Sequence, residues 1–273
     1  MQNLSDKEDV LCDYNIQDIK NLICENRKLN EIIDERNQLD AKKEIFLATL
    51  IHDLKNPLLA QIRSLQMLSD GMYGEISLKQ KNIIGVTLES IRFVDELLDS
   101  IMTSYKYDNG VIVLDKNSFD VEVLMQNCIN EIQVLAGDKN IEIQLNSELE
   151  SDERWLFADI CQIRRVISNI LNNSINYAFK GTKIRINISK NNNRLIFEIE
   201  NSSPEIPADI QEHLFEKYVS GSDIYHRTGS GLGLYLARKV IEAHNGKIYL
   251  TANSTDNRFT FEIPIEEHTN KTV

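Results

Sequence analysis

Hydrophobic residues in the first hundred positions recur at helical spacing, and the stripe they form becomes denser along the chain. Between residues 11 and 45 the stripe is sparse and close to a heptad, with Arg36 and Lys43 interrupting its seam. This pattern fits a weak coiled coil or a solvated linker helix about equally well. From about residue 46 we expect one continuous apolar helix face. Its members are Leu47, Ile51, Leu54, Leu58, Ile62 and Leu65.

A second apolar stripe follows a short segment of turn residues at 69–74. Ser77 followed by Gln80 has the spacing of a capping box, which predicts that a helix starts there and runs to about Gly110. Two long helices joined by a turn form a hairpin whose apolar stripes need a partner, so a dimeric four-helix bundle is predicted. The second stripe consists of Ile84, Leu88, Ile91, Leu98, Ile101 and Tyr105.

Beyond Gly110, short strands alternate with helices, which predicts an α+β fold class. Asp120 and Asp159 are candidate caps of helices that end near 137 and 179, and Pro207 opens a short helix to about 218. A last helix is expected from about Leu232 to His244. The expected strands are 140–145, 183–189, 195–200, 247–251 and 258–265, and the second and third are expected to form a hairpin around a polar turn at 191–193.

The predicted architecture is the helical hairpin followed by a two-layer α/β sandwich, with an antiparallel or mixed sheet and helices on one face. The corresponding segments are a helical linker at 1–45, a hairpin at 46–110, an α/β domain at 111–268 and a tail at 269–273.

Composition narrows the function classes. The net charge of −12 argues against nucleic-acid binding, which needs a basic face. No apolar run is long enough to cross a bilayer, and the polar N-terminus does not resemble a signal peptide. Because there is no such run, no membrane segment is expected in this chain. Four widely spaced cysteines indicate reduced thiols, so a cytoplasmic location is expected. These cysteines are Cys12, Cys24, Cys128 and Cys161.

A polar cluster begins at His52, which lies off the apolar stripe, so its ring should face solvent. A neutral imidazole is a nucleophile near pH 7, and Asp53 could hold its other nitrogen or accept its proton. Asn56 falls one turn later on the same face, and Pro57 should kink the helix. A lone histidine here would usually be an ordinary surface residue, but the combination of histidine, acid, amide and proline within one helix argues strongly against that interpretation.

Three further polar clusters follow in the α/β domain. Asn169 and Asn173 share a helix face with Arg165 and Asn176, where amide oxygens could meet Mg²⁺ and phosphate, although a solvated polar face explains them equally well. The segment 200–207 by itself is only a turn. The glycine-rich segment 228–234 opens a helix, and such a segment lets backbone N–H groups approach a phosphate.

In this order, the clusters resemble the sequence boxes of two-component sensor histidine kinases. The resemblance covers roughly residues 46–265. Residues 52–58 resemble the phosphoacceptor box, 169–174 the asparagine box, 214–218 the phenylalanine box and 229–234 the second glycine box.

The resemblance implies an ATP-dependent protein-histidine kinase whose 111–268 domain is of the kind shared with Hsp90, MutL and type II topoisomerases. ATP and Mg²⁺ would be its cofactors, with Asn173 on Mg²⁺, Asn169 near the phosphates and Tyr177 lining the adenine pocket. The segment 219–228 would be a mobile lid. The other nucleotide-binding candidates are Asn176, Asn201, Lys217, Gly229, Ser230, Gly231, Leu232 and Gly233.

The same resemblance implies that His52 takes the γ-phosphoryl group from ATP and passes it to an aspartate of a response regulator. Asn56 would serve the reverse, phosphatase reaction. The partners would be a second copy of the chain, bound through the hairpin, and a response regulator receiver domain.

Several positions depart from the family pattern. An aspartate and two glycines are usual where this chain has Asn201, Ser203 and Glu205, and cations are usual at Asn176 and Ser220. The absence of these cations matters because positively charged side chains neutralise the negative charge of the phosphates during phosphoryl transfer. The candidates to compensate are Arg165, Lys217 and Arg227.

These departures keep an alternative open: a catalytically weakened dimeric phosphotransfer scaffold with poor ATP binding. A chaperone-like or mismatch-repair-like ATPase of the same superfamily would share the nucleotide boxes, but it does not explain a histidine box ahead of the ATP domain.

Overall fold

The structure is a computed structural model that describes residues 5–108, 110, 112–219 and 230–265, with side chains described from residue 19 onward. The chain divides into two compact units, Met1–Asp95 and Glu96–Val273. Helix α2 (Leu78–Asp108) begins in the first unit and ends in the second. The domain boundaries expected from the sequence, at 45, 110 and 268, remain predictions.

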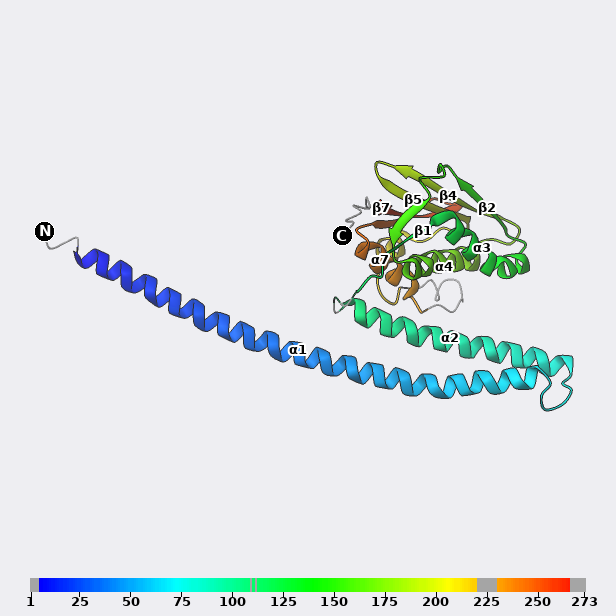
Figure 1. The fold of residues 1–273 in the computed structure, drawn as a ribbon, viewed down its shortest axis with the longest axis horizontal. Coiled ribbons are helices and arrows are strands. Elements are labelled where there is room, and N and C mark those ends of the chain that lie inside the picture. Colours follow the sequence, from blue (N-terminus) through cyan, green and yellow to red (C-terminus); the bar gives the residue numbers. More distant parts are fainter. Residues whose placement is uncertain (1–4, 109, 111, 220–229, 266–273) are drawn as a thin grey trace, which may run out of the picture. The chain divides into compact units, whose positions relative to one another are not determined.

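The first unit contains helix α1 (Ser5–Ser69) and the first part of α2 (Figure 1). Helix α1 runs without interruption through Pro57, so the linker and the first hairpin helix are one element. Within this unit Lys55 Nζ lies 3.3 Å from Asp95 Oδ1, which ties α1 to α2. Ile51 and Leu88 are buried, whereas Leu54 is 45% exposed. Part of the predicted apolar face is therefore left uncovered within a single chain.

The predicted capping box at the start of α2 is confirmed. The backbone N–H of Ser77 donates to Gln80 Oε1 at 2.8 Å, and the backbone N–H of Gln80 donates to Ser77 Oγ at 3.3 Å. These reciprocal bonds satisfy donors that a helix start otherwise leaves unpaired.

The second unit is built on a mixed five-stranded sheet in the order β2-β4-β5-β7-β6. Strand β2 (Glu142–Ser147) is parallel to β4 (Lys183–Asn191), and all other neighbours are antiparallel. The remaining strands are β5 (Arg194–Ser202), β6 (Lys247–Ala252) and β7 (Asp256–Pro264).

Helices α3 (Val121–Asp138), α4 (Ile160–Tyr177) and α7 (Gly233–Ala243) cover one face of this sheet (Figure 1). Phe197 and Phe261 stack on neighbouring strands with ring centroids 4.6 Å apart, and both are fully buried beneath the helices. The predicted two-layer α+β architecture of this unit is confirmed.

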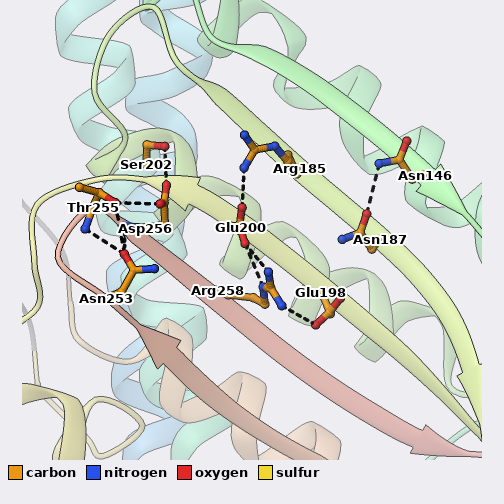
Figure 2. Close-up of polar contacts among 10 residues, drawn as sticks. All are labelled: Asn146, Arg185, Asn187, Glu198, Glu200, Ser202, Asn253, Thr255, Asp256 and Arg258. Carbon is orange, nitrogen blue, oxygen red and sulfur yellow. Dashed lines mark hydrogen bonds and ion pairs between the residues drawn. The ribbon is translucent and has the colours of Figure 1, made fainter.

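The other face of the sheet is polar (Figure 2). Arg185 Nη1 on β4 donates to Glu200 Oε1 on β5 at 2.5 Å, and Arg258 Nη2 on β7 donates to the second oxygen of the same carboxylate at 2.6 Å. Arg258 also reaches Glu198. Because side chains alternate along a strand, this ladder of charges lies opposite the apolar core.

Several local predictions in this unit are confirmed. Asp120 accepts from the N–H groups of Glu122 and Val123 at the start of α3, and Asp159 accepts from the N–H of Gln162 at the start of α4. The β4–β5 hairpin turns at 192–193, where both asparagines have positive φ.

Two predictions of secondary structure were incomplete. A two-stranded antiparallel sheet of β1 (Asn117–Asp120) and β3 (Trp155–Ala158) was not expected. The helix predicted over 207–218 is shorter and spans only α5 (Ala208–His213). At the end of the predicted range, Tyr218 adopts a left-handed backbone conformation with φ 64°. A residue with this φ cannot continue a right-handed helix.

Candidate functional site

The candidate phosphoacceptor group lies on α1 in the first unit. The side chains of His52 and Asp53 are 73% and 69% exposed, so the prediction that the ring faces solvent is confirmed. His52 Nδ1 lies 3.4 Å from Asp53 Oδ1 and 3.4 Å from Asn56 Nδ2. Both neighbours therefore approach the same ring nitrogen. Among the described residues, no side chain is hydrogen-bonded to Nε2.

The two contacts to Nδ1 require opposite tautomers. The Asp53 carboxylate can only accept from a protonated Nδ1, whereas the Asn56 amide nitrogen can only donate to an unprotonated one. An ionised carboxylate makes the stronger hydrogen bond, so it favours the tautomer with hydrogen on Nδ1. In that tautomer the lone pair of Nε2 points to solvent and can act as a nucleophile.

The candidate nucleotide residues lie in the second unit, where α4 and α7 meet. Asn169 Nδ2 on α4 donates to the carbonyl of Gly233, the first residue of α7, at 3.1 Å. Asn173 is half-buried one turn later, and Asn176 is exposed. The opposite side of α4 is buried against the core. The structure thus brings Asn169 to the glycine-rich segment.

The two chain segments beside the predicted lid are pinned to each other. The backbone N–H of Tyr218 donates to the carbonyl of Gly231 at 3.0 Å. Gly231 has φ +64°, and a Cβ atom there would lie 2.6 Å from the carbonyl carbon of Tyr218. Only glycine allows this approach without displacement of the backbone. Residues 220–228 of the predicted lid, and the candidate Gly229, lie outside the described residues.

The start of α7 resembles an anion site in its backbone. Leu232 is its N-cap residue and makes no side-chain capping bond to the described residues. Ser230 Oγ accepts from the N–H of Leu232 at 3.3 Å. The first N–H groups of a helix lack partners within the helix, and its dipole favours negative charge. This end of α7 is therefore suited to phosphate oxygens.

Two of the three cations considered as compensating groups have partners in the protein. Lys217 forms an ion pair with Asp108 and lies over the ring of Tyr235, 5.1 Å from its centroid. Arg165 Nη1 donates to Thr103 Oγ1 at 3.0 Å. Asp108 and Thr103 both belong to the last turns of α2. The third candidate, Arg227, lies outside the described residues.

Tyr235 joins the same group, because its hydroxyl donates to the Asp108 carboxylate. Burial raises the pKa of Tyr235, and the hydrogen bond to Asp108 raises it further. Neither Asp108 nor Tyr235 was singled out from the sequence. Their contact joins residues 127 positions apart, and no local sequence pattern indicates it.

Buried polar side chains gather at one end of the sheet. Asn201 on β5 is 2% exposed and lies opposite Asn257 on β7 in the strand register. Asn257 Nδ2 donates to Ser203 Oγ and, at 3.2 Å, to the carbonyl of Pro204. The half-buried Tyr177 ends α4 beside this region. Asn257 was missed, although a polar residue at an inward-facing strand position was a usable signal.

The chain matches known proteins in this region and beyond it. Residues 158–267 match the model of the histidine kinase-, DNA gyrase B- and HSP90-like ATPases. The adaptive-response sensory kinase SasA of Synechococcus sp. (strain JA-3-3Ab) is 28% identical over 84% of this chain and 61% of its own length. The sensor histidine kinase YvrG of Bacillus subtilis is 25% identical over 81% of this chain and 38% of its own. The chain thus spans less than two thirds of these relatives.

Solved structures agree with the fold. The catalytic domain of histidine kinase ThkA superposes with a TM-score of 0.50 at 27% identity, covering 55% of this chain and 96% of its own. Full-length ShkA in complex with AMPPNP gives a TM-score of 0.67 at 21% identity, covering 80% of this chain and 45% of its own. In the described part of the chain, no helix is both long and apolar enough to span a bilayer.

The order of the boxes, the arrangement of α4 and α7 and these matches lead to one assignment. The chain is similar to two-component sensor histidine kinases over most of its length, and its residues 158–267 match the histidine kinase-, DNA gyrase B- and HSP90-like ATPases.

Proposed function

We propose that this chain autophosphorylates on Nε2 of His52 from ATP and then passes the phosphoryl group to an aspartate of a response regulator. The observation that carries the proposal is the asymmetry of the His52 ring. Asp53 engages Nδ1 at 3.4 Å, while Nε2 makes no hydrogen bond to the described residues. Such an arrangement fixes which nitrogen can attack.

The proposed step conserves charge and atoms. The Nε2 lone pair attacks the γ-phosphorus, the bond to the bridging oxygen breaks, and ADP leaves with that electron pair. Positive charge develops on the imidazole, and Asp53 is placed to stabilise it and to accept the Nδ1 proton.

We propose the α4–α7 junction as the nucleotide site. The amide oxygen of Asn173 would hold Mg²⁺, and Asn169 with the first N–H groups of α7 would contact phosphate oxygens. Bound Mg²⁺ would supply charge neutralisation at the phosphates. The residues fit this role because the side chain of Asn169 already reaches Gly233, the first residue of α7.

A second copy of the chain is the proposed partner of the hairpin. Uncovered apolar side chains on α1 and α2 support this, since large exposed apolar surfaces on paired helices usually mark an interface. Among those 40% or more exposed are Leu54, Leu59, Phe93 and Val94.

A response regulator is the proposed acceptor of the phosphoryl group. A structure of histidine kinase ThkA in complex with the response regulator TrrA shares this fold, with a TM-score of 0.57 and 21% identity. Asn56, one turn beyond His52, supports a phosphatase role, because its amide could orient a water molecule at a phosphorylated regulator.

A second candidate function is a phosphotransfer scaffold with weak ATP binding. The ion pair of Lys217 with Asp108 and the bond of Arg165 to Thr103 favour it, because both cations already have partners within the protein. Calorimetry with Mg²⁺ and ATP separates the two candidates. Micromolar affinity supports the kinase, and absence of binding supports the scaffold.

The proposal is tested by incubating the protein with γ-labelled ATP and Mg²⁺. We expect the protein to carry a label that is lost in acid and kept in base. The variant His52→Gln should carry no label. His213→Gln is a matched control, since His213 is also an exposed histidine bonded to an acidic neighbour, and it should keep the label. Label that persists in His52→Gln would contradict the assignment of the phosphoacceptor.

A further inference from the structure

Four buried polar side chains occupy the region where α4 packs on β5 and where β5 pairs with β7. Asn201, Ser203, Asn257 and Ser174 are each no more than 2% exposed. The N–H of Phe179, just beyond α4, donates to the carbonyl of Ser202 at 3.0 Å, which brings the end of this helix to the end of β5. Such a concentration of polar groups in a core needs an explanation, since burial of polar groups is unfavourable unless they are paired.

The pairing inside this cluster is incomplete. Both hydrogens of the Asn257 amide are used, one by Ser203 Oγ and one by the carbonyl of Pro204. Asn257 Oδ1 and Ser174 Oγ are buried and have no hydrogen-bond partner among the described residues. For Asn201 no hydrogen bond of the side-chain amide is seen in the described part of the chain. Unpaired buried polar atoms of this kind mark a place for a polar ligand or an ordered water.

We infer that this cluster reads the edge of the purine base, and that Asn201 makes the site accept guanine as well as adenine nucleotides. The inference rests on the proposed nucleotide site and specifies its substrate class. The cluster lies at the end of α4 that follows Asn169 and Asn173, so a nucleotide with its phosphates at those residues would extend its base towards it.

The chemical reason is the difference between an amide and a carboxylate. Adenine presents an amine donor at its 6 position, and guanine presents a carbonyl acceptor there. A carboxylate only accepts, so it pairs with adenine and repels guanine. The Asn201 amide has a donor and an acceptor at nearly the same place, and a half-turn about its last side-chain torsion exchanges them. It can therefore pair with either base.

The test compares Mg²⁺–ATP and Mg²⁺–GTP binding to the full chain by calorimetry. In the wild type we expect the two dissociation constants to agree within about tenfold, which is the discrimination that one exchangeable hydrogen bond leaves. In Asn201→Asp, GTP should weaken relative to ATP by a further factor of about ten or more, because the base carbonyl then faces a negative charge.

Asn187→Asp is the matched control. Asn187 lies on the polar face of the sheet, and its Oδ1 accepts from Asn146 Nδ2 at 3.2 Å (Figure 2). The variant introduces the same charge and keeps that acceptor, so the ratio of ATP to GTP affinity should not change.

The outcomes separate the inference from the proposal beneath it. Tight ATP binding with GTP weaker by about a hundredfold or more in the wild type would overturn the inference and leave the kinase proposal standing. Failure of both nucleotides to bind would overturn the nucleotide site itself. The wild-type ratio decides the question even if Asn201→Asp does not fold.

Discussion

The contact between Tyr218 and Gly231 makes Gly231→Ala the most informative single substitution in the proposed nucleotide site. The new Cβ would lie 2.6 Å from the Tyr218 carbonyl carbon and 2.8 Å from both its Cα and the Val219 nitrogen. All three are backbone atoms, so no side chain can rotate away. The positive φ of +64° adds strain for any residue with a Cβ.

The expected loss of ATP affinity can be estimated from the backbone strain and the lost hydrogen bond. An alanine in the left-handed region costs about 1–2 kcal/mol. Separation of the two segments loses the hydrogen bond from Tyr218 to Gly231, worth about 1 kcal/mol. If these roughly 2–3 kcal/mol are expressed in binding, ATP affinity should fall about 30- to 150-fold.

The assay is calorimetry with Mg²⁺ and ATP, together with thermal unfolding to check the fold. Gly233→Ala is the matched control, because its Cβ would lie 3.6 Å or more from Asn169 in ordinary van der Waals contact and would not strain the backbone. That variant should unfold at the wild-type temperature. Unchanged ATP affinity and unfolding in Gly231→Ala would refute the reasoning.

Three further substitutions test other parts of the account. His244→Phe should lower the free energy of unfolding by about 1–3 kcal/mol in denaturant titrations, because buried His244 accepts from the Asp159 N–H at 3.1 Å; an unchanged midpoint would contradict this. Ser77→Ala should cost about 1 kcal/mol through the lost helix cap, and an unaltered unfolding curve would count against the capping role. Asp108→Asn should lower the raised pKa of Tyr235 in a spectrophotometric titration, since burial and the Asp108 carboxylate raise it. In the wild type, stability from protonated Tyr235 is complete below its ordinary pKa of about 10 and is lost as pH rises further; identical titrations of wild type and variant would exclude the contact.

Features set by neighbouring residues could be predicted from the sequence. The capping box at Ser77 and the caps at Asp120 and Asp159 depend on side chains within three positions of the backbone groups that they bond. The 192–193 hairpin turn depends on two adjacent asparagines that adopt positive φ. The exposed position of His52 likewise follows from helical periodicity alone. Local chemistry therefore sufficed to place the proposed phosphoacceptor group on an exposed helix face.

Features that join distant segments could not be predicted. Strands β1 and β3 have four residues each, too few to show an alternating pattern. The partner of Lys217 is 109 positions away, so the sequence offered Lys217 as a phosphate-binding cation without revealing the competing carboxylate. The close approach of Gly231 to Tyr218 also depends on how α7 packs, which a glycine pattern does not specify.

The central claim is that His52 is the residue phosphorylated from ATP. It is tested most directly by digesting the protein after incubation with Mg²⁺–ATP, under alkaline conditions, and locating the modified residue by mass spectrometry. We predict one added phosphoryl group on the peptide that contains His52, removed by mild acid and absent in His52→Gln. A phosphoryl group on another residue, or none on a protein that binds ATP, would contradict the claim.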